Sequence, residues 1–153
     1  SARGDLIAIF PSDLEYSVDD LSFLIKNFIN SNFEFINGNR SNNLNSNRSG
    51  MFKRSFVSKI GGALAGFLLY IKHNIQVSDL LSTMKVFKKS SLLNQKFKAQ
   101  CIDFDAELLI TIFKNGGTIV EFPVSYFARS YKQGKKTTVF KGINLLKYIF
   151  VKG

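Results

Sequence analysis

Hydrophobic residues fall along this chain in two patterns, short unbroken runs and sets at helical spacing. The first run, residues 6–10, contains no polar side chain, and it predicts a strand buried on both faces, as in a parallel sheet. Ser17 follows as a plausible helix cap, with Asp19 and Asp20 in the first turn. The apolar residues after it recur at helical spacing and predict a helix that packs on the sheet: Leu21, Leu24, Ile25, Phe28 and Ile29.

The rest of the chain repeats this alternation. Residues 33–36, 84–87 and 118–121 predict strands, and residues 37–40 predict a turn after the first of them. Residues 51–72 and the segment that begins at Asp105 predict helices, and residues 139–151 predict an amphipathic one. Strands that alternate with helices indicate an α/β fold.

Glycines interrupt the predicted helix 51–72 at residues 61, 62 and 66. A phosphate-binding loop would need a preceding strand and a Lys-Ser or Lys-Thr ending, and this stretch has neither. We expect small residues here to let the helix lie close to a neighbour or to lipid headgroups.

Composition and charge narrow the class of protein. A chain of 153 residues is long enough for one domain with a real core, and a single Cys101 argues against a disulfide-built module. The net charge of +10 indicates anionic partners: phosphates, nucleic acid or an acidic membrane surface. Residues 35–78 contain no Asp or Glu, and no apolar run reaches the ~18 residues that a membrane span needs. Because the chain opens without Met and almost directly on a core strand, we expect it to be a truncated piece.

Several Asp and Glu residues lie after predicted strands or before predicted helices, and the carboxyl ends of strands are where α/β folds commonly hold their functional residues. Asp13 and Glu15 follow the first strand, and such hard oxygen ligands suit a divalent cation that carries a phosphorylated substrate. Asp79 precedes another apolar run, and Asp105 and Glu107 open a helix. Helix capping is the alternative explanation for Asp13, Asp79 and Asp105.

Cations gather late in the chain. Residues 129–153 hold seven Lys or Arg and no acid. Around Gly134 stand Arg129, Lys132, Lys135 and Lys136, which suit a flexible lid that clamps a diphosphate. A solvated loop or a membrane-surface patch is the alternative. Arg40, at the tip of the turn after the second strand, is a further candidate for phosphate binding or a solvated turn residue.

Several of these segments, in this order, resemble blocks of the family-two inverting glycosyltransferases, in the polyprenyl-phosphate branch typified by dolichyl-phosphate mannosyltransferase. The matching segments are Asp13-Leu14-Glu15-Tyr16, Asn39-Arg40, the stretch from Asp79 to Phe87, Phe104-Asp105-Ala106-Glu107-Leu108, residues 121–126 and residues 129–136. The chain departs from the family where Pro11 replaces the first metal-binding Asp, where Thr83 replaces Gly and where Gln133 replaces Glu.

The resemblance implies the carboxyl-terminal part of a GT-A-like mixed sheet with flanking helices. Residues 1–153 would then be one incomplete catalytic domain that lacks the amino-terminal nucleotide-binding units. The implied activity is inverting transfer of a sugar from a nucleotide-sugar to a polyprenyl phosphate or a related membrane acceptor. Asp13 and Glu15 would hold Mg²⁺ or Mn²⁺, and Asp79, Asp105 and Glu107 would be the catalytic carboxylates. Arg40, Arg129, Lys132, Lys135 and Lys136 would bind phosphate.

On this interpretation the protein is a cell-envelope enzyme that lies in the cytoplasm, peripheral at the membrane. A non-catalytic remnant, or a basic scaffold that docks a membrane or a partner subunit, is the main alternative. Nucleic acid is not an expected partner, because the aromatic residues sit at apolar-face spacing and not among the cations as stacking platforms.

Overall fold

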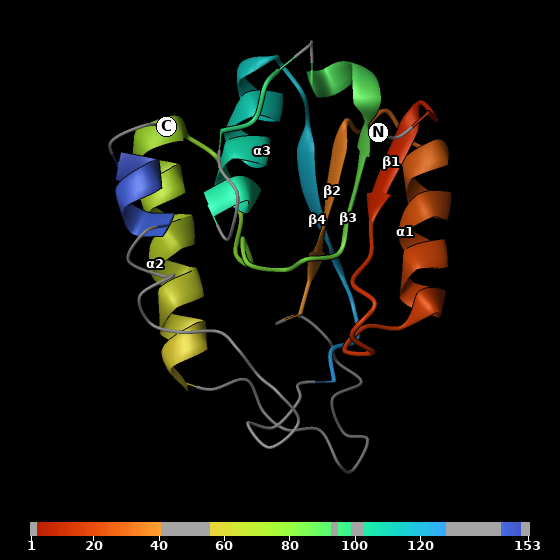
Figure 1. The fold of residues 1–153 in the computed structure, drawn as a ribbon, viewed down its shortest axis with the longest axis horizontal. Coiled ribbons are helices and arrows are strands. Elements are labelled where there is room, and N and C mark those ends of the chain that lie inside the picture. The colour runs from red at the N-terminus through yellow and green to blue at the C-terminus, as the bar shows by residue number, and fades with distance from the viewer. Residues whose placement is uncertain (1–2, 41–55, 93–94, 99–102, 128–144, 151–153) are drawn as a thin grey trace.

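In the part of the chain that the structure describes, a four-stranded mixed sheet has helices on both faces (Figure 1). The computed structural model describes residues 3–40, 56–92, 95–98, 103–127 and 145–150, and in residues 56–60 only the backbone. The strands are β1 (Leu6–Ile9), β2 (Phe35–Asn39), β3 (Lys85–Lys88) and β4 (Ile119–Pro123), in the order β1-β3-β2-β4. The helices are α1 (Val18–Ile29), α2 (Phe56–His73) and α3 (Asp103–Lys114), with a short 3-10 turn, Lys89–Leu92, after β3. Residues 145–150 are also helical.

β3 is antiparallel to both of its neighbours, β1 and β2, and β4 is parallel to β2. β1, β2 and β4 therefore run in one direction, and their carboxyl ends lie at the same end of the sheet. The prediction that β1 is buried on both faces is wrong. β1 is an edge strand of the described sheet, and its residues are only partly buried, with Ala8 exposed.

α1 begins at the predicted cap, and most of its predicted apolar residues pack on the sheet. Ser17 Oγ accepts a hydrogen bond from the Asp19 N–H at 3.2 Å, which caps the helix. Leu24 and Phe28 are buried against the sheet residues of one face: Ile36, Met84, Val86 and Val124. The expectation that Ile29 shares this core is wrong, since Ile29 ends the helix with 69% of its surface exposed.

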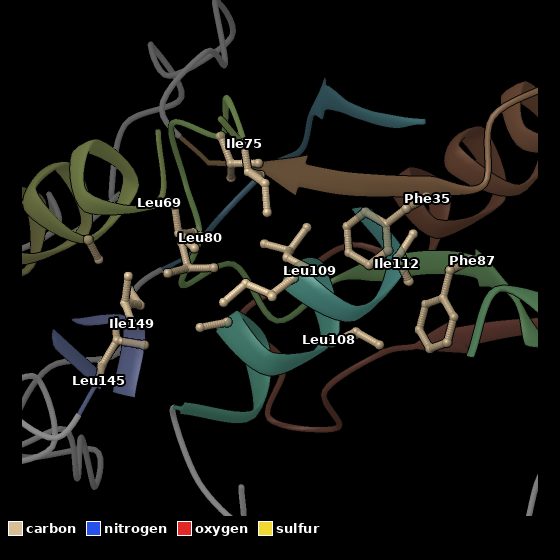
Figure 2. Close-up of a cluster of buried hydrophobic side chains, with 14 residues drawn as sticks. Phe35, Leu69, Ile75, Leu80, Phe87, Leu108, Leu109, Ile112, Leu145 and Ile149 are labelled. Carbon is tan, nitrogen blue, oxygen red and sulfur yellow. The ribbon is translucent and has the colours of Figure 1, made fainter. Parts of the chain in front are cut away.

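The larger core lies on the opposite face of the sheet, between β2, β3, α3 and α2 (Figure 2). Phe35 and Phe87 stack there with ring centroids 5.8 Å apart, and Leu108, Leu109 and Ile112 of α3 pack over them. Beyond α3, the core continues through Leu69 of α2 to Leu145 and Ile149. The prediction of a helix across 139–151 is confirmed for residues 145–150.

Small residues in α2 do let it lie close to a neighbour. Gly66 is buried, and a Cβ added there would come within 2.4 Å of the Val77 carbonyl oxygen. Gly116, with φ of 80°, follows the end of α3, as the Asn-Gly-Gly sequence predicts.

Two predicted boundaries are wrong. β2 does not end at Ile36 but continues through Asn37 and Asn39, both buried, because their side-chain amides find partners inside the protein. Asp105 does not cap α3, because the helix already begins at Asp103 and Asp105 lies in its first turn.

Candidate functional site

Toward the carboxyl ends of β1, β2 and β4, the side chains on the α3 face of the sheet change from apolar to polar. On the α3 face, one row of paired residues is entirely apolar: Ile7, Phe87, Phe35 and Ile119. Two residues farther along, the next row is Ile9, Lys85, Asn37 and Glu121. Because residues two apart share a face, this second row places the buried Lys85 and Asn37 and the partly buried Glu121 directly beside the core. The candidate site is built on this polar row, on the segments that follow β1, β2 and β4, and on the loop before β3.

Arg40 and Asp79 form an ion pair in this region. Asp79 Oδ2 accepts hydrogen bonds from the Arg40 N–H at 2.9 Å and from Nε at 2.8 Å, and Oδ1 lies 2.7 Å from Nη2. The side chains are 9% and 0% exposed, so the pair is screened little by water. Burial alone would lower the pKa of Arg40, but the bonds to Asp79 outweigh it and hold that pKa above its ordinary value. Asp79 caps no helix; it fixes the orientation of a guanidinium.

Arg40 connects this pair to the segment after β1. Its guanidinium carbon lies 4.9 Å from the centre of the Tyr126 ring, and the Tyr126 hydroxyl donates to Glu15 Oε2 at 2.9 Å. Tyr16 packs edge-on against Tyr126 with ring centroids 5.2 Å apart. Burial and, after it, the bond to Glu15 raise the pKa of Tyr126, so this hydroxyl stays a donor. A continuous chain of contacts therefore runs from Glu15 through Tyr126 and Arg40 to Asp79.

Glu121, at the middle of β4, holds the loop that carries Asp79. Its Oε1 accepts from Asn37 Nδ2 and from the Asp79 N–H, both at 3.0 Å. Its Oε2 accepts from Asn39 Nδ2 at 3.1 Å, from the Ser78 N–H at 2.9 Å and from Ser78 Oγ at 2.5 Å. One carboxylate thus accepts five hydrogen bonds from β2 and from the loop before β3.

Lys85 and Asp105 form a second charged pair at the border of the site. Lys85 is fully buried on β3. Its Nζ lies 3.0 Å from Asp105 Oδ1 and also donates to the carbonyl oxygen of Ser82. Burial raises the pKa of Asp105, and the opposing effects of Lys85 and Arg40 do not cancel this rise. Because the charges of Arg40 and Asp79 both act on Asp105, this carboxyl belongs to the same electrostatic neighbourhood as the first ion pair.

The remaining predicted residues are placed differently. Asp13 Oδ1 accepts from the Glu15 N–H at 3.2 Å, in the loop between β1 and α1. Glu107 is buried at the start of α3, where it accepts from the Lys98 N–H at 3.1 Å and 3.2 Å. Burial and the neighbouring Glu107 raise the pKa of Tyr148 to about 12. Among the described residues, Glu107 is therefore linked to Lys98 and Tyr148. Four predicted phosphate-binding residues lie outside the described residues: Arg129, Lys132, Lys135 and Lys136.

Asp13 and Glu15 are the residues that could hold a divalent cation. Magnesium is often bound by one or two carboxylates together with substrate phosphates, so a pair of this kind is chemically suitable. Across the parts of the chain that the structure describes, His, Cys, Asp and Glu side chains form no group of three or more that could hold a metal ion.

Several residues of the site were not predicted as site residues: Glu121, Asn37, Asn39, Lys85 and Tyr126. The sequence contains patterns from which these residues could have been predicted. A Lys between apolar strand residues, as at Lys85, indicates a buried partner, and Asn37 and Asn39 stand two apart, so they share a face of an extended strand. Glu121 and Tyr126 stand in one of the segments that carry the resemblance.

No family model matches the chain. No helix in the described ranges is both long enough and apolar enough to cross a bilayer.

Proposed function

We propose that the protein is part of an inverting glycosyltransferase that transfers a sugar from a nucleotide-sugar to a polyprenyl phosphate or a related membrane-associated acceptor. The observation that carries the proposal is the Arg40–Asp79 pair and its link through Tyr126 to Glu15. Residues from four of the segments that resemble the family contribute to one chain of contacts. A mixed sheet flanked by helices is also compatible with the carboxyl-terminal part of a GT-A domain.

Arg40 is the residue that would bind phosphate. A guanidinium has five N–H donors in a rigid fork, and the Asp79 carboxylate accepts from two side-chain nitrogens, Nε and Nη2. Asp79 thereby holds the fork in one orientation, so that its other donors can meet the oxygens of a phosphate at little entropic cost. In this role Asp79 orients Arg40 and does not act as a general base, which a polyprenyl phosphate hardly needs.

A divalent cation, when bound at Asp13 and Glu15, would neutralise charge on the leaving diphosphate. Tyr126 would then have a positioning role, because its hydroxyl donates to Glu15 and its ring lies against Arg40. Asp105 and Lys85 would contribute to the electrostatic potential beside the Arg40–Asp79 pair. We place Glu107 outside this arrangement.

A transfer assay tests the proposal. The protein is incubated with Mg²⁺, a panel of radiolabelled nucleotide-sugars and a short-chain polyprenyl phosphate, and labelled lipid is separated and counted. Asp79→Asn should reduce transfer at least about 100-fold, because the loss of one carboxylate charge releases the oriented guanidinium. Asp19→Asn makes the same chemical change at an exposed position on α1 and should leave transfer unchanged. Equal activity of the two variants would contradict the assignment of Asp79.

Binding of the acceptor is a second readout that does not require turnover. Addition of the protein should shift and broaden the ³¹P resonance of the short-chain polyprenyl phosphate, and Arg40→Lys should weaken this effect, because a lysine cannot make two parallel bonds. Absence of both transfer and saturable binding would contradict the proposal.

Pro11 favours the alternative, a non-catalytic remnant, because it stands where the resembled family has a metal-binding Asp. Pro11→Asp separates the two. If the site is catalytic, the added carboxylate should strengthen Mn²⁺ binding and raise transfer. If the protein is a remnant, the substitution should change neither.

A further inference from the structure

α2 is apolar on the side that faces away from the core as well as on the side that faces it. The inward residues Ala65 and Leu69 are completely buried. The outward residues are exposed by 43%, 58%, 52% and 64% respectively: Leu64, Phe67, Tyr70 and Ile71. Spacings of three, six and seven residues place them on one side of the helix. Figure 1 shows α2 on the far side of α3 from the sheet, so this side is an outer surface of the described structure.

α1 shows what an ordinary outer helix surface looks like in the same protein. It also exposes three large apolar residues, Val18, Phe23 and Ile29. They form no stripe, because the polar Ser22 and Lys26 lie between Val18 and Ile29 and Phe23 lies on another side of the helix. On α2 the positions between Leu64 and Ile71 offer no such polar residue on the exposed side. A continuous exposed stripe of large apolar residues is typical of an interaction surface.

The charges beside the stripe are cationic. α2 and the helical residues 145–150 contain no Asp or Glu. Lys72 donates to the carbonyl oxygen of Phe150 and lies 5.7 Å from the centre of its ring, which places the 70%-exposed Phe150 at the end of the stripe. Lys147 is exposed on the same short helix. Aromatic and aliphatic side chains bordered by lysines match the surface of an anionic bilayer, where the apolar groups enter the headgroup boundary and the lysines meet phosphate.

We propose that the outward side of α2, comprising Leu64, Phe67, Tyr70 and Ile71 with Lys72 and Phe150 beside it, docks flat on the surface of an anionic phospholipid bilayer. The helix would lie in the interface with its apolar side chains in the lipid. The inference rests on the proposed function only for its purpose, which is to bring the site to a membrane-embedded acceptor. Docking itself requires no nucleotide-sugar, so either proposal can fail without the other.

Vesicle flotation tests the docking surface with a matched pair of variants. The wild-type protein should float with vesicles of phosphatidylcholine mixed with phosphatidylglycerol, and much less with phosphatidylcholine alone. Ile71→Ser should lower the partition coefficient about ten-fold, because one buried aliphatic side chain is lost from the interface. Ile29→Ser removes an equally exposed isoleucine from α1, on the other face of the sheet, and should float like the wild type. No flotation of the wild type, or equal loss in both variants, would overturn the proposal.

A tryptophan placed in the stripe gives an independent readout. The chain contains no Trp, so Phe67→Trp introduces a single reporter. Its emission should shift to shorter wavelength when anionic vesicles are added, and brominated lipids should quench it, whereas Ile29→Trp should show neither effect. Emission already shifted in the absence of lipid, together with a doubled mass in light scattering, would assign the stripe to contact between two copies of the chain and overturn the proposal. A partner protein on this surface would give the same negative result with vesicles.

Discussion

Glu121, which was not predicted as a site residue, connects two elements of the site to the loop that carries Asp79. Its five hydrogen bonds join β4 to β2 and to the Ser78–Asp79 backbone, and the position of Asp79 determines in turn the orientation of Arg40. Every one of its partners is a donor. A carboxylate, which only accepts, satisfies all of them, whereas an amide cannot.

Glu121→Gln should therefore lower the free energy of unfolding by about 1–3 kcal/mol, because the new NH₂ group faces N–H donors and leaves at least one of them unpaired. Urea unfolding measures this loss. Hydrogen exchange measured by NMR should also show faster exchange of the Ser78 and Asp79 amides, while the α1 amides keep their rates. Unchanged exchange at Ser78 and Asp79 would show that Glu121 does not hold this loop.

Glu34 gives a residue-level prediction with a definite pH dependence. The Thr118 N–H and the Lys88 ammonium, each 3.1 Å away, lower the pKa of Glu34 below 4.5, its ordinary value. A carboxyl whose pKa is lower in the folded state stabilises the fold above its unfolded pKa, and this contribution disappears as the pH falls through the folded value.

Glu34→Gln should accordingly be less stable than the wild type at neutral pH, by up to about 1 kcal/mol for a partly exposed pair. The difference should shrink as the pH falls below the usual carboxyl range of about 4. Urea midpoints of both proteins across this range provide the measurement. A difference that stays constant with pH would mean that the Glu34 charge contributes nothing.

At the scale of elements, the packing of α2 depends on a glycine that leaves room for a close backbone contact. The helix approaches the Val77 carbonyl so closely at Gly66 that no Cβ fits. At Gly61 nothing lies within 4 Å of the position that a Cβ would occupy. A substitution at Gly66 therefore tests the close packing of α2, and the same substitution at Gly61 tests helix propensity alone.

Gly66→Ala should destabilise the protein by about 1–3 kcal/mol, because helix or loop must shift to accept the methyl group. Gly61→Ala should stabilise it by about 0.5–1 kcal/mol through helix propensity alone. Thermal unfolding followed by circular dichroism compares the two. If both substitutions stabilised the protein, α2 would not lie against the segment that contains Val77.

The elements themselves could be predicted because their signals are local. Ser17, the helix-spaced leucines of α1 and the glycines after α3 each act within a few residues. The end of β2 could not, because Asn37 and Asn39 have low strand propensity and become strand residues only through partners at positions 78, 79 and 121. The partial exposure of β1 was missed for a similar reason, since its place at the sheet edge depends on which strand pairs with it.

The same distinction applies to the candidate site. Asp13, Glu15, Arg40, Asp79 and Asp105 could be selected as polar residues at element ends. What the sequence could not show is which of them meet: Arg40 and Asp79 are separated by 39 positions, and Glu107 turns away to Lys98 although it lies only two residues from Asp105. Strand pairing sets the first of these contacts, and the packing of α3 sets the second.

At the scale of the whole molecule, the described residues form two hydrophobic cores on opposite faces of one sheet. Val86 and Phe87 are neighbours on β3, yet Val86 belongs to the core under α1 and Phe87 to the core under α3. The same division holds for Phe35 and Ile36 on β2. Neither core can lose its packing without disturbing strands that the other core needs, so we expect a single cooperative unfolding transition.

Leu24→Ala under α1 and Leu109→Ala under α3 test this expectation, because both leucines are completely buried, one in each core. Each substitution should lower the free energy of unfolding by about 2–5 kcal/mol. In both variants, circular dichroism and tyrosine fluorescence should report the same single urea transition. Ile29→Ala removes an exposed aliphatic side chain from α1 and should stay within about 0.5 kcal/mol of the wild type. If Leu24→Ala instead produced an early transition that left the signal of α3 intact, the two faces of the sheet would fold independently, and a site built across β1, β2 and β4 would lose the rigid support that an oriented Arg40 requires.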